Sequence, residues 1–213
     1  MSARGRGAEV TADEFYETPA WCVRRLLESI PEPSGKRWVE PAVGSGAIVR
    51  ACNGYIGGLG HLINNGIPQF DGFDLVERPG AAACCRFFER DIRKAVASPQ
   101  TIAEAITPNR YDLSITNPPF SLALYFAEYG IRNADRTALL LRLNWLECGA
   151  SEATLKRARF LAAHAPDVRI LPNRPSFTGR GTDACAYAWF CWGFGFRSGT
   201  WRMLATTPKE ERR

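Results

Sequence analysis

Apolar residues along the chain follow two alternating spacings, one typical of buried strands and one typical of amphipathic helices. The run 137–143 is almost continuously apolar, which is typical of a strand buried on both faces of a sheet. By contrast, Val23, Leu26, Leu27 and Ile30 recur at helical spacing. Because strand-type and helix-type segments alternate through most of the chain, the pattern predicts an α/β fold. We expect a doubly wound, mostly parallel sheet of seven strands in a single domain.

The same pattern places the individual elements. Strands are expected at residues 37–40, 70–76, 84–89, 111–116, 137–143, 168–171 and 185–196. Helices are expected after the capping pair Thr18-Pro19, near 93–106, over 121–132 and from Ser151 to about residue 163. A further helix is expected after the glycine loop at 41–46, and the glycine-rich segment 54–60 is interpreted as an insertion.

Length and composition agree with one domain. The 213 residues, 46% hydrophobic and 23% charged, suit a globular protein with a single core. Residues 1–13 are expected to be disordered, 14–200 to form the folded domain and 201–213 to form a basic C-terminal tail. No apolar run nears the roughly 18 residues of a membrane span, and no apolar secretion signal is seen at the N-terminus. We therefore expect a cytoplasmic protein with no membrane partner.

Cysteine spacing and net charge narrow the possible chemistry. The seven cysteines are irregularly spaced without a C-x-x-C pair, and only two histidines accompany them. This predicts reduced thiols and no metal site. The net charge of +5 is compatible with a polyanionic partner.

The tetrapeptide Asn117-Pro118-Pro119-Phe120 directly follows the apolar run 111–116. Two prolines cannot donate backbone hydrogen bonds, so strand pairing must stop there and a rigid turn follows. Open α/β sheets bind ligands at this end of their strands. Carbonyl groups beside an asparagine amide and an aromatic ring suit a planar amine, which can donate hydrogen bonds while its ring is stacked. A plain loop would carry the same turn signals.

A second group of polar residues also follows predicted strands. The segment from Glu40 to Gly46 opens a helix, and its glycines allow close approach to a ligand, although the third glycine of a dinucleotide-binding loop is missing. Glu40 would repel a pyrophosphate but attract a cationic ligand. Asp74 could accept from two ribose hydroxyls, and Asp91 from an adenine amine. Either acid alone is better explained as an exposed loop residue, but their order ahead of Asn117 favours one common site.

Together these residues resemble the S-adenosylmethionine-dependent amino-methyltransferases of class I fold. The resemblance is strongest to the DNA N6-adenine methyltransferases whose cofactor motifs come first, and it covers residues 15–196. Residues 15–19 resemble the Tyr-x-Thr-Pro element that holds the methionine part of the cofactor. Residues 139–144 resemble the fifth-strand motif. Residues 174–177, 182–183 and 188–192 resemble the target-base region of small phage-type adenine methylases.

The resemblance implies S-adenosylmethionine as cofactor, DNA as partner and the cytoplasm of a bacterium or phage-infected cell as location. The residues it implies for catalysis are Asn117, Pro118, Pro119 and Phe120. Those implied for the cofactor are Tyr16, Thr18, Glu40, Pro41, Ala42, Gly44, Gly46, Asp74, Leu75, Asp91 and Asn117. Those expected to bind the substrate are Phe120, Arg174, Phe177 and Arg180. The two phenylalanines would stack on a flipped adenine, and the two arginines would meet phosphates.

Three alternatives stay open. The same chemistry could act on RNA adenine or on the amide nitrogen of a protein glutamine, although glutamine methylases of this type usually carry tyrosine where this chain has Phe120. The chain could also be a cofactor-binding subunit that no longer catalyses, but such a subunit has no physical need for an intact Asn117–Phe120 motif. No separate target-recognition domain is seen, which predicts a short target sequence or broad adenine methylation.

Overall fold

The computed structural model describes residues 17–31, 36–59, 66–97, 110–177 and 184–212. Residues 1–13, Tyr16, Arg180, the segment 182–183 and most of the helix expected near 93–106 lie outside the described residues. The remaining predictions can be compared with the structure.

The described residues form one sheet with strand order β3-β2-β1-β4-β5-β7-β6-β8. The strands are β1 (Arg37–Glu40), β2 (Gln69–Asp74), β3 (Arg86–Glu89), β4 (Tyr111–Thr116), β5 (Ala134–Arg142), β6 (Asp167–Ile170), β7 (Tyr187–Trp192) and β8 (Trp201–Met203). Strands β1 to β5 are parallel, whereas β7 runs antiparallel to both of its neighbours, β5 and β6. The predicted α/β, mostly parallel sheet is therefore confirmed.

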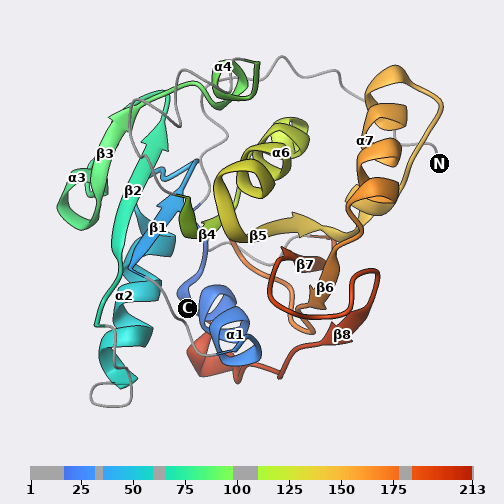
Figure 1. Cartoon of the computed structure of the whole chain (residues 1–213). Coiled ribbons are helices and arrows are strands. Elements are labelled where there is room, and N and C mark those ends of the chain that lie inside the picture. The colour runs from blue at the N-terminus through green and yellow to red at the C-terminus, as the bar shows by residue number, and fades with distance from the viewer. Residues whose placement is uncertain (1–16, 32–35, 60–65, 98–109, 178–183, 213) are drawn as a thin grey trace.

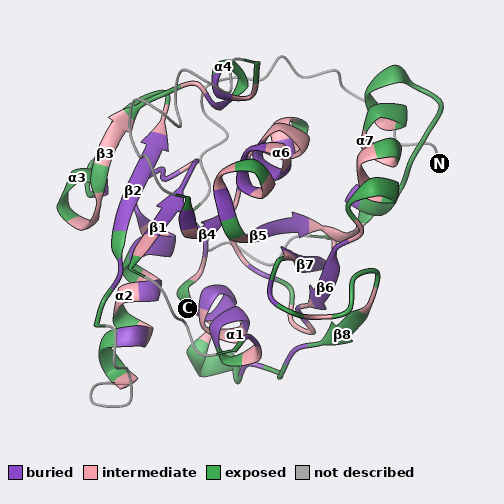
Figure 2. Ribbon diagram, viewed as in Figure 1, coloured by how far each residue is buried: buried purple, intermediate pink, exposed green. Residues whose placement is uncertain are grey.

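Helices cover both faces of this sheet (Figure 1). They are α1 (Ala20–Ser29), α2 (Ala47–Leu59), α3 (Ala81–Cys84), α4 (Ile92–Ala97), α6 (Ala123–Asn133) and α7 (Glu152–Ala163). Apolar side chains of α1 and α2 form one core cluster with the sheet, and those of α4 and α6 form a second one on the other face. The central strands between these clusters are largely buried (Figure 2). Two separate cores on opposite faces are what a doubly wound sheet requires.

The glycine-rich segment 54–60 was wrongly interpreted as an insertion. Its described residues, 54–59, are the second half of α2. Cys52 and Ile56 are buried one helical turn apart, whereas Gly54 and Gly58 are exposed with no other atoms near their missing side chains. Burial of the apolar stripe thus outweighs the roughly 1 kcal/mol by which each glycine disfavours a helix.

The sheet has eight strands rather than the seven expected, because residues 201–203 of the expected tail form β8. This strand pairs in parallel with β6. The next residue, Leu204, is buried, and its amide donates to the Ile170 carbonyl at 2.8 Å. Thr207 is also buried and accepts from Arg25 Nε at 2.9 Å. The alternation of apolar and polar residues over 201–204 is too short to predict a strand from the sequence. Strand β8 is defined by these tertiary contacts.

No helix in the described part of the chain is long and apolar enough to cross a membrane.

Candidate active site

The glycine loop lies at the carboxyl end of β1, between Pro41 and the start of α2. Gly44 and Gly46 have φ values of +53° and +83°, a region in which L side chains are strained. A Cβ at Gly46 would also lie 2.3 Å from Cys84 Sγ, so the Cys84 side chain would have to move. The predicted glycines are therefore required by the backbone. They leave a short, buried turn of peptide groups at the N-terminus of a helix.

Asp74 ends β2 and is bonded directly to this loop. Its Oδ2 accepts from the Gly44 amide at 2.9 Å, and its Oδ1 accepts from the Leu75 amide at 2.7 Å. The Val43 amide also donates to the Phe73 carbonyl at 2.8 Å. The structure thus brings together two predicted site residues that are 30 positions apart, and the exposed Leu75 side chain lies beside them.

Glu40 is the most unusual ionisable group at this edge of the sheet. Glu40 is only 2% exposed, and its Oε2 atom has no hydrogen-bond partner among the described residues. Burial, and secondarily the nearby charge of Asp74, raise the pKa of Glu40 well above its ordinary value. A buried acceptor without a partner is costly to leave unpaired. A ligand that brings a positive charge or an N–H donor to this point would relieve that cost.

The segment that precedes α1 is tied to the same loop. Ser45 Oγ donates to the Glu17 carboxylate in a short hydrogen bond. The Arg50 guanidinium, from α2, donates to the Ser45 carbonyl and lies 3.5 Å from the same Glu17 carboxylate. Sequence reasoning singled out neither Glu17 nor Arg50 for a role. These contacts place the predicted Thr18-Pro19 pair against the glycine loop.

Asn117 follows β4 and contacts this N-terminal segment. Its Nδ2 donates to Thr18 Oγ1 at 3.0 Å, and Thr18 is only 6% exposed. With Nδ2 engaged by a buried hydroxyl, the amide orientation is set and Oδ1 is presented as an acceptor. Pro118 is buried and Pro119 half-buried, so the predicted rigid turn is held by its surroundings.

Phe120 and Phe177, the two rings expected to enclose a base, both pack on Tyr187. The ring centroids lie 5.9 Å and 5.1 Å from that of Tyr187. Arg142 joins the same group: its guanidinium lies 4.7 Å from the Phe120 ring centroid, and its Nε donates to the Tyr187 hydroxyl at 3.0 Å. Sequence reasoning assigned no role to Arg142 or Tyr187. The only signal was a charged residue that ends the buried run of β5.

Two other predicted residues have simpler surroundings. Asp91 forms an ion pair with Arg93 at 2.7 Å, and hydrogen bonds from Arg93 hold the pKa of Asp91 below its ordinary value. Asp91 lies beyond β3, next to β2 in the sheet, so it belongs to the same edge but contacts Arg93 rather than the loop. Arg174 is exposed and precedes Phe177 in an irregular segment. Neither residue is linked to Asn117 by a hydrogen bond that the structure describes.

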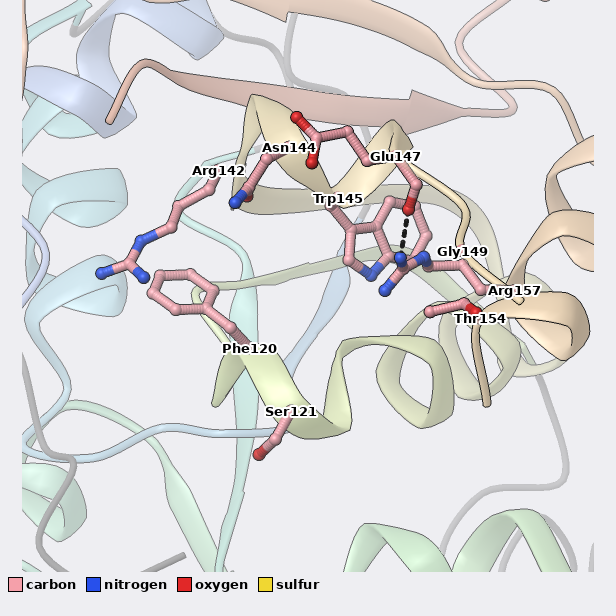
Figure 3. A pocket seen from close by; sticks show the side chains of 9 residues that line it. All are labelled: Phe120, Ser121, Arg142, Asn144, Trp145, Glu147, Gly149, Thr154 and Arg157. Carbon is pink, nitrogen blue, oxygen red and sulfur yellow. Dashed lines mark hydrogen bonds between the residues drawn. The ribbon is translucent and has the colours of Figure 1, made fainter. Parts of the chain in front are cut away.

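A cavity of about 480 Å³ opens beside Phe120, on the β5 side of the Asn117–Phe120 turn (Figure 3). Its walls include Phe120, Arg142, Asn144, Trp145, Thr154 and Arg157. The volume is in the range of small-molecule sites. Among the described residues, no three His, Cys, Asp or Glu side chains lie together as a metal site would require.

No protein-family model matches this chain, and no curated protein matches it. Solved structures do match. A protein described as a modification subunit of a type I restriction enzyme from Vibrio vulnificus YJ016 is similar over 95% of this chain and 50% of its own, with a TM-score of 0.62 and 15% identity. The type I restriction-modification methyltransferase subunit from Streptococcus thermophilus is similar over 85% of this chain and 45% of its own (TM-score 0.56, 13% identity).

A third structure, described as a class I S-adenosylmethionine-dependent methyltransferase from Listeria monocytogenes, matches over 87% of this chain and 64% of its own (TM-score 0.56, 12% identity). The chain spans about half the length of the two restriction-system subunits. Identities this low show the fold alone. The chain has the class I methyltransferase fold.

Proposed function

We propose that this protein transfers a methyl group from S-adenosylmethionine to the exocyclic N6 amine of adenine in DNA. The observation that carries the proposal is the hydrogen bond from Asn117 Nδ2 to Thr18 Oγ1. It holds an amide acceptor and the Pro118–Pro119 turn beside the glycine loop, at the edge of a sheet whose fold is that of class I methyltransferases. The two restriction-system structures are methyltransferase or modification subunits by description, which supports the same reaction class.

The described residues fit the cofactor. Glu40 has an unpaired, buried acceptor that suits a cationic ligand, and Gly44 and Gly46 have positive φ values that disfavour a side chain. Asp74 and the exposed Leu75 would meet the ribose and the adenine ring, and Asp91 the adenine amine. The expected set is completed by Thr18, by Pro41 and Ala42 of the first turn, by Asn117, and by Tyr16, which lies outside the described residues. When bound, S-adenosylmethionine would supply a methyl group on a sulfonium, and its transfer would release the neutral thioether S-adenosylhomocysteine while the amine loses one proton to solvent.

The role of the protein groups is to position a weak nucleophile. The lone pair of an exocyclic adenine amine is delocalised into the ring. Asn117 Oδ1 and the Pro118 carbonyl would each accept one N–H, which favours a pyramidal nitrogen with an available lone pair. Phe120 would stack on the flipped base and Phe177 would lie on its other side. Because positioning dominates, no strong general base is needed.

The alternatives, RNA adenine, protein glutamine and a non-catalytic subunit, are separated by one experiment. The protein is incubated with methyl-labelled S-adenosylmethionine and, separately, with DNA, RNA and a protein acceptor. We expect label in DNA, and digestion of that DNA should release N6-methyldeoxyadenosine. Label only in RNA, or only in protein, would mean that RNA or protein is the substrate instead of DNA. Cofactor binding without transfer to any acceptor would support the non-catalytic subunit.

A further inference from the structure

The cavity beside Phe120 has walls of two chemical kinds. Phe120 and the buried Trp145 supply aromatic surface, whereas Arg142 and Arg157 place guanidinium groups on opposite sides of it (Figure 3). Asn144 adds an amide with both donor and acceptor atoms. Flat apolar surface beside fixed cations is the combination that proteins use to bind single nucleotides of a strand.

Arg157 is held in place on α7. One of its terminal nitrogens donates to the Glu147 carbonyl in a short hydrogen bond, and its guanidinium carbon lies 6.0 Å from the Trp145 ring centroid. Its Nε is buried and has no hydrogen-bond partner. A guanidinium that is fixed yet keeps an unpaired donor is prepared for an anion, and arginine is especially suited to phosphate oxygens.

The one carboxylate at the cavity does not cancel this charge. The Glu147 side chain extends away from the Arg157 guanidinium, which its backbone carbonyl contacts instead (Figure 3). Asn144 also lines the cavity. Carboxylate and amide groups can bond the polar edge of a base. The cavity therefore offers one side to a phosphate and another to a base edge.

We propose that this cavity binds the nucleotide adjacent to the target adenine on the same strand, with its phosphate at Arg157 and the polar edge of its base at Asn144. The inference rests on the proposed function and names a second subsite for its substrate. It favours a nucleic-acid strand over a glutamine-bearing peptide, because a neutral amide side chain has no use for two guanidinium groups. It also places a phosphate contact on α7, outside the pair Arg174 and Arg180 that was expected to meet phosphates.

The test uses a matched pair of arginines on one helix. Arg157 lines the cavity, whereas Arg159 is exposed on α7 and does not line it. Binding of a fluorescent single-stranded oligodeoxynucleotide with one adenine is measured by anisotropy, with S-adenosylhomocysteine present. We expect Arg157→Gln to raise the Kd by about tenfold or more, the scale of one charge-assisted contact. The slope of log Kd against log salt should fall by about 0.7. Arg159→Gln removes the same charge and should change Kd by less than about threefold.

Equal effects of the two substitutions, or no effect of either, would overturn the inference. If the parent nevertheless methylates DNA, the proposed function stands and only the subsite is wrong. If the parent binds no oligonucleotide and labels only a peptide, both are wrong. Thermal unfolding of each variant controls for folding.

A second variant is used if Arg157→Gln fails to fold. Ser121 is exposed and lines the cavity, so the bulky ring of Ser121→Trp should block oligonucleotide binding. Parental binding by that variant would also contradict the subsite.

Discussion

Thr18 links the N-terminal segment to the proposed reaction. Its hydroxyl meets Asn117 Nδ2 across 99 positions of sequence. Thr18→Val keeps the shape but removes the acceptor, so the amide of Asn117 can rotate away from its proposed target. We expect kcat for methyl transfer to fall by roughly 10- to 100-fold, the range associated with small misplacements of a catalytic group. The measurement is kcat at saturating cofactor, with calorimetry for cofactor affinity. Thr18→Ser keeps the hydroxyl and should stay near the parent. A Thr18→Val enzyme with parental kcat would remove Thr18 from this role.

Glu40 makes stability depend on pH in a direction that burial determines. Its native pKa lies well above the ordinary value of 4.5, so the native state holds a proton that the unfolded state releases as pH rises. The contribution of Glu40 to the free energy of unfolding is therefore fully present below about pH 4.5 and is lost as pH rises toward the native pKa. The Glu40→Gln protein has no ionisable group at this position. As pH rises, its free energy of unfolding should therefore fall less than that of the parent. Chemical denaturation of the ligand-free proteins between about pH 5 and 8 measures this. If the free energy of unfolding depends on pH in the same way for both proteins, the pKa of Glu40 is not raised in the native state.

Strand β8 shows how an element that sequence patterns miss can still be part of the core. Leu204, which follows it, is 7% exposed, whereas Met203 is 53% exposed. Leu204→Ala should lower the free energy of unfolding by about 2–5 kcal/mol, the range for removing a buried leucine side chain. Met203→Ala, a neighbouring truncation at the surface, should change it by less than about 0.5 kcal/mol. Urea denaturation of both variants provides the comparison. Equal small effects would show that residues after 200 contribute nothing to the core.

Elements with strong apolar patterns were predictable from sequence, and those defined by tertiary contacts were not. The strands at 37–40 and 111–116 have the same bounds in sequence and structure, because each contains buried apolar residues and ends at a proline-containing turn signal. The 54–60 segment was misjudged because glycine counts against a helix locally, whereas burial of Ile56 is visible only in three dimensions. The first residues of β5, from Ala134 to Arg136, were missed because two of them are charged and lie at the amino end of the strand.

The fold as a whole explains which parts of the candidate site could be anticipated. Parallel strands bring their carboxyl ends to one edge, so Glu40, Asp74 and Asn117 converge once the strand order is known. The contacts made across the antiparallel β5–β7 pair could not be inferred in this way. Tyr187 comes from an antiparallel strand, and Arg142 reaches it across the β5–β7 pair. Their contact depends on the register of that pair, which the sequence pattern does not specify.

Asn117→Ala provides the most direct test of the proposed active site, because Asn117 is assigned to the target amine and not to the acidic contacts of the cofactor. The measurement is transfer of labelled methyl groups to DNA by parent and variant, with nucleoside digestion to identify the product. Calorimetry and thermal unfolding of the same samples are the controls. The account predicts near-parental cofactor affinity and stability with transfer reduced by several orders of magnitude, because positioning can supply roughly 7–11 kcal/mol of barrier reduction. A folded Asn117→Ala protein that forms N6-methyldeoxyadenosine at close to the parental rate would contradict it.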